Sequence, residues 1–216
     1  MRDDIADKLE LHRQWLYYNK MVDSPMDSIS KPGDPKPPRG VKANFFGVNM
    51  DDVLLPEYDF SGAYMSRARM QGADLHGAKL IGTDLSYAKL RGANFALARL
   101  NEADLSEADL RDANLSWVNL QSAVMTGAQL AGANICYAVG NGREIKNLHP
   151  ATPDAWWLTY TATHMSIGCN LHPLEDWWVM SDEDIRAMAP GALKLWRVNK
   201  QPIMDAITAF PAEEYG

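Results

Sequence analysis

The stretch ANFALARLNEADLSEADLRDANLSWVNL, from Ala93 to Leu120, places an apolar residue at every fifth position. The period continues in both directions, so that residues 43–137 contain nineteen consecutive pentapeptides with apolar centres. A small residue, usually alanine, lies two positions before each centre, often followed by aspartate or asparagine. A period of five fits neither a helix nor a flat strand. It predicts a solenoid, in which each repeat buries its apolar side chains by stacking on its neighbours.

Several of these units follow one pattern, A-[DN]-L-x-x: ADLHG (73–77), ANFAL (93–97), ADLSE (103–107), ADLRD (108–112) and ANLSW (113–117). In this they resemble the pentapeptide-repeat family. The resemblance implies a β-solenoid, a right-handed quadrilateral β-helix with four pentapeptides per coil, in which the central and the small residue point inward. Large leucine and small alanine can interlock at core density without voids, so the residues agree with that architecture.

The flanking sequence predicts a cover for each end of this solenoid, which we place at residues 43–138. Residues 1–22 form an N-terminal helix, because Ile5, Leu9, His12 and Leu16 share one face. The Pro-rich stretch 23–42 reads as an extended tether. The first coil departs most from the pattern, with Tyr58 at an alanine position, and we expect it to be irregular and covered by the helix.

Residues 139–216 predict a small α+β C-terminal module. Residues 156–169 have β-rich composition typical of a hairpin, and 172–178 resemble a short helix with Pro173 in its first turn. Ser181 to Asp184 resembles a capping box that opens another helix, and 192–209 resembles a last helix, interrupted or kinked near Pro202. This Trp-rich tail also looks like a C-terminal module of phage members of the family.

Composition excludes several classes of protein. The chain carries 28 acidic and 21 basic residues, and the repeat itself carries 11 and 7. That balance fits neither a basic nucleic-acid footprint nor a dense acidic mimic, so we expect no direct nucleic-acid binding. No apolar run is long enough to span a membrane, and the start lacks the apolar core of a signal peptide. We expect a cytoplasmic protein with Cys136 and Cys169 as free thiols.

A four-sided coil stacks residues twenty apart, which predicts columns of like side chains on the surface. Leu97, Trp117 and Tyr137 would form an exposed apolar ridge, suited either to a partner or to the protein's own tail. The charged columns are candidate partner contacts too, although solvated positions can also match by chance. They comprise the basic residues Arg69, Lys89, Arg91 and Arg111 on one face and the acidic residues Asp84, Asp104 and Glu107 on another.

Catalytic and cofactor chemistry find little support in the sequence. Cys169 and His172 are close enough to suggest a thiol nucleophile with a base, but a buried structural cysteine is the stronger interpretation. The histidines and cysteines show no zinc spacing, and the chain has neither a phosphate-binding loop nor a zinc-protease motif. We therefore assign no catalytic residue, no metal and no cofactor.

Three functions remain open at this point. The first is a non-catalytic binding protein that presents a rigid face to a protein partner. The family resemblance gives it a concrete form, since quinolone-resistance and mycobacterial members imitate duplex DNA and engage gyrase. A phage-encoded member would inhibit or modulate a host DNA-processing enzyme or defence protein in the same way. The alternatives are an enzyme that uses Cys169 and His172, and a self-assembling structural protein, with a closed homodimer as its simplest form.

Overall fold

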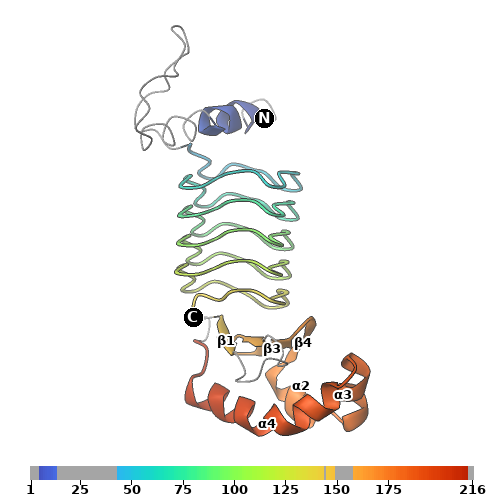
Figure 1. Ribbon diagram of the computed structural model, residues 1–216. Coiled ribbons are helices and arrows are strands. Elements are labelled where there is room, and N and C mark those ends of the chain that lie inside the picture. The colour runs from blue at the N-terminus through green and yellow to red at the C-terminus, as the bar shows by residue number, and fades with distance from the viewer. Residues whose placement is uncertain (1–4, 14–42, 144, 149–157, 214–216) are drawn as a thin grey trace, which may run out of the picture.

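The computed structural model describes residues 5–13, 43–143, 145–148 and 158–213. These residues form a rod of stacked coils, with a helix above the first coil and a sheet and helices below the last one (Figure 1). The predicted tether at 23–42, residues 1–4 and 14–22 of the predicted first helix, and the first two residues of the predicted hairpin lie outside the described residues.

Parallel backbone pairing between residues twenty apart builds the rod. The pairing begins with Asn44 and Tyr64 and continues at every fifth residue to Asn119 and Val139. Two-residue turns separate the paired positions, so four short sides close each coil. Coils stacked as paired strands rise by about 4.8 Å each. The predicted right-handed quadrilateral β-helix is therefore confirmed.

Leucine and alanine fill the interior of the coils in alternating layers. Leu90, Leu100 and Leu110 are wholly inaccessible to solvent, as are Ala93, Ala103 and Ala108 between them. A small side chain next to a large one lets adjacent coils approach to backbone hydrogen-bonding distance while leaving no void. Burying a leucine contributes roughly 1.5–3 kcal/mol, so repetition along the rod gives a large stabilising term.

Stacked amide side chains reinforce one face of the rod. Asn94 donates from Nδ2 to Asp74 Oδ1 at 3.0 Å, Asn114 donates likewise to Asn94 at 3.0 Å, and Asn134 to Asn114 at 3.2 Å. The Oδ1 atom of each of these four side chains also accepts a hydrogen bond from the backbone N–H two residues further along the same coil, at 3.1 to 3.2 Å. The recurrence of Asp or Asn before the centre thus serves both the local turn and the stacking of coils.

The N-terminal helical segment, residues 5–13, covers the open end of the first coil (Figure 1). Ile5 and Leu9 pack on the core of the rod, and the Tyr58 hydroxyl donates to the Leu9 carbonyl at 2.6 Å. The expected cover is thus present over the described part of the helix. The expectation of an irregular first coil was wrong, because its backbone keeps all four paired positions. Tyr58 in place of alanine is accommodated by contact with the helix.

His12 is the buried polar residue of this cover. Its ring lies 6.3 Å from the Phe45 ring and 6.2 Å from the Phe60 ring, and the side chain is wholly buried. Burial lowers the pKa of His12, and neighbouring Asp59 offsets part of that shift. The cover is consequently built around a neutral imidazole.

The C-terminal module consists of a four-stranded antiparallel sheet, in the order β1-β2-β3-β4, and three helices. The sheet lies between the last coil and the helices (Figure 1). The elements are β1 (Lys146–Leu148), β2 (Leu158–Tyr160), β3 (His164–Ile167), β4 (Asn170–Pro173), α2 (Leu174–Val179), α3 (Asp182–Met188) and α4 (Ala192–Ala209).

The two faces of this sheet pack against different parts of the protein. One face closes the rod, where Asn147 Nδ2 donates to the Ala138 carbonyl at 2.8 Å and Leu171 packs on the core of the coils. The other face carries a second core, in which Tyr160 and Met165 pack with residues of the helices. Trp177 is its largest buried side chain, and its Nε1 donates to the Met165 carbonyl at 2.8 Å. The strand alternation therefore joins two cores through one sheet.

Several predicted elements of the module are present. The hairpin appears as β2 and β3, and α3 begins with the predicted capping box between Ser181 and Asp184. Two details were wrong. Residues 170–173 form strand β4, so Pro173 precedes helix α2 instead of lying in its first turn. Helix α4 runs from Ala192 to Ala209 with Pro202 inside it, so the expected interruption is absent, while a kink at Pro202 stays a prediction.

We predict that acid weakens the N-terminal cover through His12. Because the pKa of His12 is lowered in the folded protein, the unfolded chain takes up the proton more readily below about pH 6.5. The contribution of His12 to the free energy of unfolding is therefore fully present above that pH, and it is lost as the pH falls towards the pKa of His12 in the folded protein.

Thermal unfolding at about pH 7.5 and about pH 5 tests this expectation in wild type and His12→Gln. The variant should be less stable at the higher pH but lose less on acidification. An equal loss in both proteins would assign the pH dependence to carboxylates elsewhere.

Candidate functional site

The corners of the rod set the conditions for any surface site. Every pentapeptide ends in a residue with positive φ, which is glycine in eight of them and another residue in eleven. The left-handed conformation costs roughly 1–2 kcal/mol for a residue with a Cβ, although asparagine and aspartate tolerate it better. A large apolar residue at a corner is therefore unfavourable for the fold unless something else compensates.

Leu97, Trp117 and Tyr137 occupy one such corner in three successive coils, with φ between 56° and 60°. We call these three residues the apolar ridge. The side chains of Leu97 and Trp117 are 53% and 56% exposed. The rings of Trp117 and Tyr137 stack with centroids 4.2 Å apart and planes 20° from parallel. The predicted column is therefore present, and its two aromatic members support each other.

The C-terminal module takes up part of this ridge. The Tyr137 hydroxyl lies 3.3 Å from the position that a Cβ would have on Gly168, in the turn after β3. Burial raises the pKa of Tyr137, and neighbouring Cys169 raises it further. Tyr137 is accordingly half-buried against the protein's own tail, while Leu97 and Trp117 remain open to a partner.

The predicted basic columns exist but are largely neutralised. Arg69 pairs with an aspartate of the preceding coil, Arg91 with one of the following coil, and Arg111 with one of its own side. The partners are Asp51 at 2.7 Å, Asp112 at 2.9 Å and Asp109 at 2.7 Å. Among the described residues, Lys89 has no ion pair within 4 Å. The face therefore offers alternating charges instead of a positive patch.

Arg111 shows the electrostatic effect of this pairing. Its guanidinium lies 2.8 Å from Asp109 Oδ1 and 2.7 Å from Oδ2, which lowers the pKa of that carboxyl and raises the pKa of the arginine. Exposed pairs of this kind contribute little to stability, but they reduce the field that a distant partner would meet.

The acidic face differs from the basic one because its charges have no counter-ions among the described residues. Asp84 and Asp104 are paired positions of adjacent coils, and Glu107 follows Asp104 at the next corner. Each aspartate accepts from its neighbouring serine hydroxyl at 2.6 Å and from that serine's N–H at about 3 Å. Sequence reasoning omitted Glu102, at the corner before Asp104, which extends this face.

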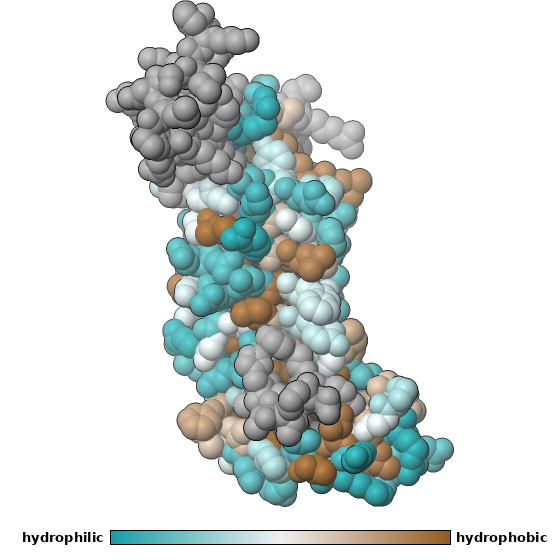
Figure 2. Space-filling model, viewed as in Figure 1, coloured by the Kyte–Doolittle hydropathy of each residue, from teal (hydrophilic) through white to brown (hydrophobic). Residues whose placement is uncertain are grey.

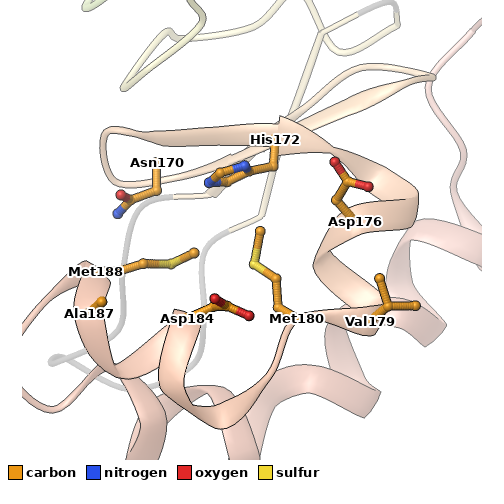
Figure 3. A pocket seen from close by; sticks show the side chains of 8 residues that line it. All are labelled: Asn170, His172, Asp176, Val179, Met180, Asp184, Ala187 and Met188. Carbon is orange, nitrogen blue, oxygen red and sulfur yellow. The ribbon is translucent and has the colours of Figure 1, made fainter.

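A cavity of about 570 Å³ opens in the C-terminal module between β4 and helices α2 and α3 (Figure 3). Asn170 and His172 project from β4, and the side chains of Met180, which follows α2, and Met188, at the end of α3, extend into the space between strand and helices (Figure 3). His172 also contacts the Trp177 ring edge to face, with centroids 5.3 Å apart. Among the described residues, no three or more histidine, cysteine, aspartate or glutamate side chains gather in a way that could hold a metal ion.

Cys169 and His172 lie in different surroundings. His172 lines the cavity, whereas Cys169 is exposed in the β3–β4 turn and neighbours Cys136 and Tyr137 of the last coil. The expectation that Cys169 is a buried structural cysteine was therefore wrong, whereas Cys136 is the buried one of the two. Within the part of the chain that the structure describes, no hydrogen bond joins the Cys169 thiol to the His172 ring.

Other exposed apolar side chains are scattered. On the side shown in Figure 2, hydrophilic residues predominate and hydrophobic ones appear singly along the coils. Tyr87 is one exposed aromatic outside the ridge, at 54%, and it already contacts Arg67, whose guanidinium lies 5.6 Å from the ring centre. Single exposed apolar residues are common on soluble surfaces. The ridge stands out because its members adjoin one another.

Comparison with known proteins adds a family. A family model of pentapeptide repeats matches residues 43–80, 78–116 and 113–139. Among solved structures, the pentapeptide repeat protein alr5209 from Nostoc is 33% identical, with 42% of this chain and 82% of that chain covered and a TM-score of 0.36. A pentapeptide repeat protein from the Arabidopsis thaliana thylakoid lumen is 32% identical over 44% of this chain and 66% of that one, with a TM-score of 0.36.

HetL, a pentapeptide repeat protein involved in heterocyst differentiation regulation in Nostoc, is 32% identical, with a TM-score of 0.37. The match covers 45% of this chain and 51% of HetL, so the chain spans about half of that relative. No curated protein matches the chain. Within the described residues, no helix has both the length and the apolar character needed to cross a membrane.

We predict that the ridge costs stability. Leu97→Asn should raise the free energy of unfolding by up to about 1 kcal/mol, because asparagine adopts positive φ more readily than leucine. The reverse change at another corner, Gly82→Leu, should lower it by about 1 kcal/mol, since φ is +61° there and nothing lies within 4 Å of the added Cβ.

Urea denaturation of both variants and wild type provides the measurement. A clear loss of stability in Leu97→Asn would show that Leu97 is needed for folding, and the functional interpretation of the ridge would then lose its basis.

Proposed function

Because this chain belongs to the pentapeptide-repeat family, we propose that it is a non-catalytic binding protein that presents one corner of a rigid rod to a protein partner. The observation that carries this proposal is the apolar ridge. Leu97 and Trp117 are exposed at positions where the fold favours glycine or asparagine. Unlike Tyr87, they lie in one line with Tyr137, on which Trp117 stacks, and such adjoining exposed apolar side chains support a contact with a partner.

The rod suits this role because it is pre-organised. Backbone pairing between coils and the closed ends hold the ridge in one geometry, so that binding requires little ordering of the chain. Stacked Trp117 and Tyr137 offer a broad apolar contact with few rotatable bonds. Aromatic anchors of this kind commonly contribute much of the binding energy in protein interfaces.

We further propose that the protein acts in the cytoplasm and is of phage origin. In this version it inhibits or modulates a host DNA-processing enzyme, such as gyrase, or a defence protein. The acidic face supports this version, because Asp84, Asp104 and Glu107 could meet a basic DNA-binding surface. Neutralisation of the arginine columns supports it as well, since those columns would otherwise repel such a surface. A closed homodimer is compatible with this role.

We keep the enzyme and self-assembly alternatives below the binding function. Cys169 neighbours Cys136 and Tyr137 of the last coil, whereas His172 lines the cavity, and this placement disfavours a thiol–imidazole pair. Both ends of the rod carry a cover, the helix at 5–13 and the sheet of the C-terminal module, and these covers oppose end-to-end stacking.

We predict that Trp117→Asn abolishes capture of the partner while Tyr87→Asn leaves it intact. Both residues are exposed to a similar extent, at 56% and 54%, and both occupy corners with positive φ. The two substitutions therefore change the backbone strain to a similar extent, but they alter different corners of the rod. Affinity capture from bacterial lysate, quantified by mass spectrometry, makes the comparison. Equal loss in both variants, or in neither, would contradict a contact on the ridge.

We further predict that the full-length protein alters gyrase supercoiling, and that Asp84→Asn together with Asp104→Asn reduces the effect. Removal of two unpaired carboxylates should weaken attraction to a basic surface, most clearly at low salt. Glu175→Gln together with Glu183→Gln is the control, because it also removes two negative charges, from exposed positions of the C-terminal module. If supercoiling is unchanged at saturating protein, gyrase is not the target, and the ridge experiment above remains an independent test of partner binding.

A further inference from the structure

The last coil and the C-terminal module each contribute one cysteine to their junction. Cys136 belongs to the last full pentapeptide of the rod and is buried, with 5% of its surface exposed. Cys169 lies in the two-residue turn between β3 and β4 and is exposed. The sequence separates these thiols by more than thirty residues, and the fold returns the second to the first.

Ser166, Gly168 and Cys169 place the β3–β4 turn against the last coil. The Ser166 hydroxyl lies 3.4 Å from Cys136 Sγ and 2.6 Å from the Gly168 carbonyl oxygen. Gly168 in turn faces the Tyr137 hydroxyl, which lies 3.3 Å from the position of an added Cβ. Cys169 follows directly, and its thiol interacts with the side chains of both Cys136 and Tyr137. Both sulfurs are therefore held at one junction by residues on either side.

The two thiols differ in ways that suit successive roles. Burial raises the pKa of Cys136, and the neighbouring Cys169 thiol raises it further, while Ser166 offsets part of the shift. Cys136 is thus less ionised than an ordinary thiol and is shielded from solvent, so an external oxidant reaches it less readily than Cys169. Cys169 is open to solvent and meets small oxidants first.

We propose that Cys136 and Cys169 are a redox modification site, at which a peroxide converts the two thiols into a disulfide that fastens the C-terminal sheet to the rod. Cys169 sulfur attacks one peroxide oxygen, the O–O bond breaks, and a sulfenic acid and a water form. Cys136 sulfur then attacks the sulfenic sulfur, the S–S bond forms, and a second water leaves. Hydrogen peroxide is reduced by two electrons and the two thiols are oxidised. In a reducing compartment the pair stays open until peroxide arrives.

The disulfide would form next to Tyr137, the member of the apolar ridge that contacts the C-terminal module. Tyr137 adjoins Cys136 in the chain, contacts the turn that carries Cys169 and stacks on Trp117. Cross-linking the turn to the coil removes the freedom of the module to separate from the last coil. The oxidised protein should therefore unfold at a higher temperature than the reduced one.

The test treats reduced full-length protein with stoichiometric hydrogen peroxide, under native conditions and in urea, and alkylates the remaining thiols before mass spectrometry. We expect native wild type to lose two hydrogen atoms, to resist alkylation, and to yield one cross-linked peptide pair that dithiothreitol reverses. The reaction should be at least tenfold faster in the native protein than in urea, because the fold brings the thiols together. Thermal unfolding of the oxidised sample should shift upward.

Two variants identify the order of attack. In Cys136→Ser, a sulfenic acid on Cys169 should accumulate and be trapped by dimedone. In Cys169→Ser, the buried Cys136 should remain an alkylatable thiol for much longer. The proposal is overturned if native wild type accumulates oxidised Cys169 beside a free Cys136, if the cross-link joins two chains, or if oxidation is no faster in the folded protein than in urea.

Discussion

Pairing of each residue with the one twenty positions later is the constraint on which this structure depends. It fixes a coil of four equal sides, and only a sequence that repeats every five residues can then place an apolar side chain inside on every side. Alanine beside leucine sets the distance between coils, and the amide ladder from Asp74 to Asn134 keeps their register on one face. The covers at both ends follow from the same constraint, because a stack of open coils leaves unpaired backbone at each end.

Sequence periodicity was enough to predict the rod, because its interactions are local and repeated. The same period placed Leu97, Trp117 and Tyr137 in one column and the charged residues in others. It could not predict how those columns are satisfied. Arg91 reaches forward to Asp112 and Arg69 reaches back to Asp51, and such choices depend on side-chain conformations that leave no trace in the period. The first coil was misjudged because Tyr58 and the helix compensate for each other.

The C-terminal module shows the opposite limit. Local features of its sequence, such as the capping box at Ser181, were predictable. The way in which the module packs on the end of the rod was not, because it depends on contacts between segments that are distant in sequence. Asn147, Leu171 and Ser166 each meet the last coil from a different strand. Alternation along short strands divides the sheet into a face for the rod and a face for the helices. That division separates Cys169 from His172, which adjacency in sequence had suggested as a pair.

A coil that closes after twenty residues has a consequence for how such proteins can change during evolution. Insertion of one pentapeptide would turn everything beyond it by a quarter of a revolution, and would carry Trp117 and the C-terminal module to a different side of the molecule relative to the N-terminal cover. Insertion of four would lengthen the rod by about 4.8 Å and leave all faces aligned. Length and orientation of the recognition surfaces are thus adjusted in separate steps, by gains or losses that the core tolerates equally.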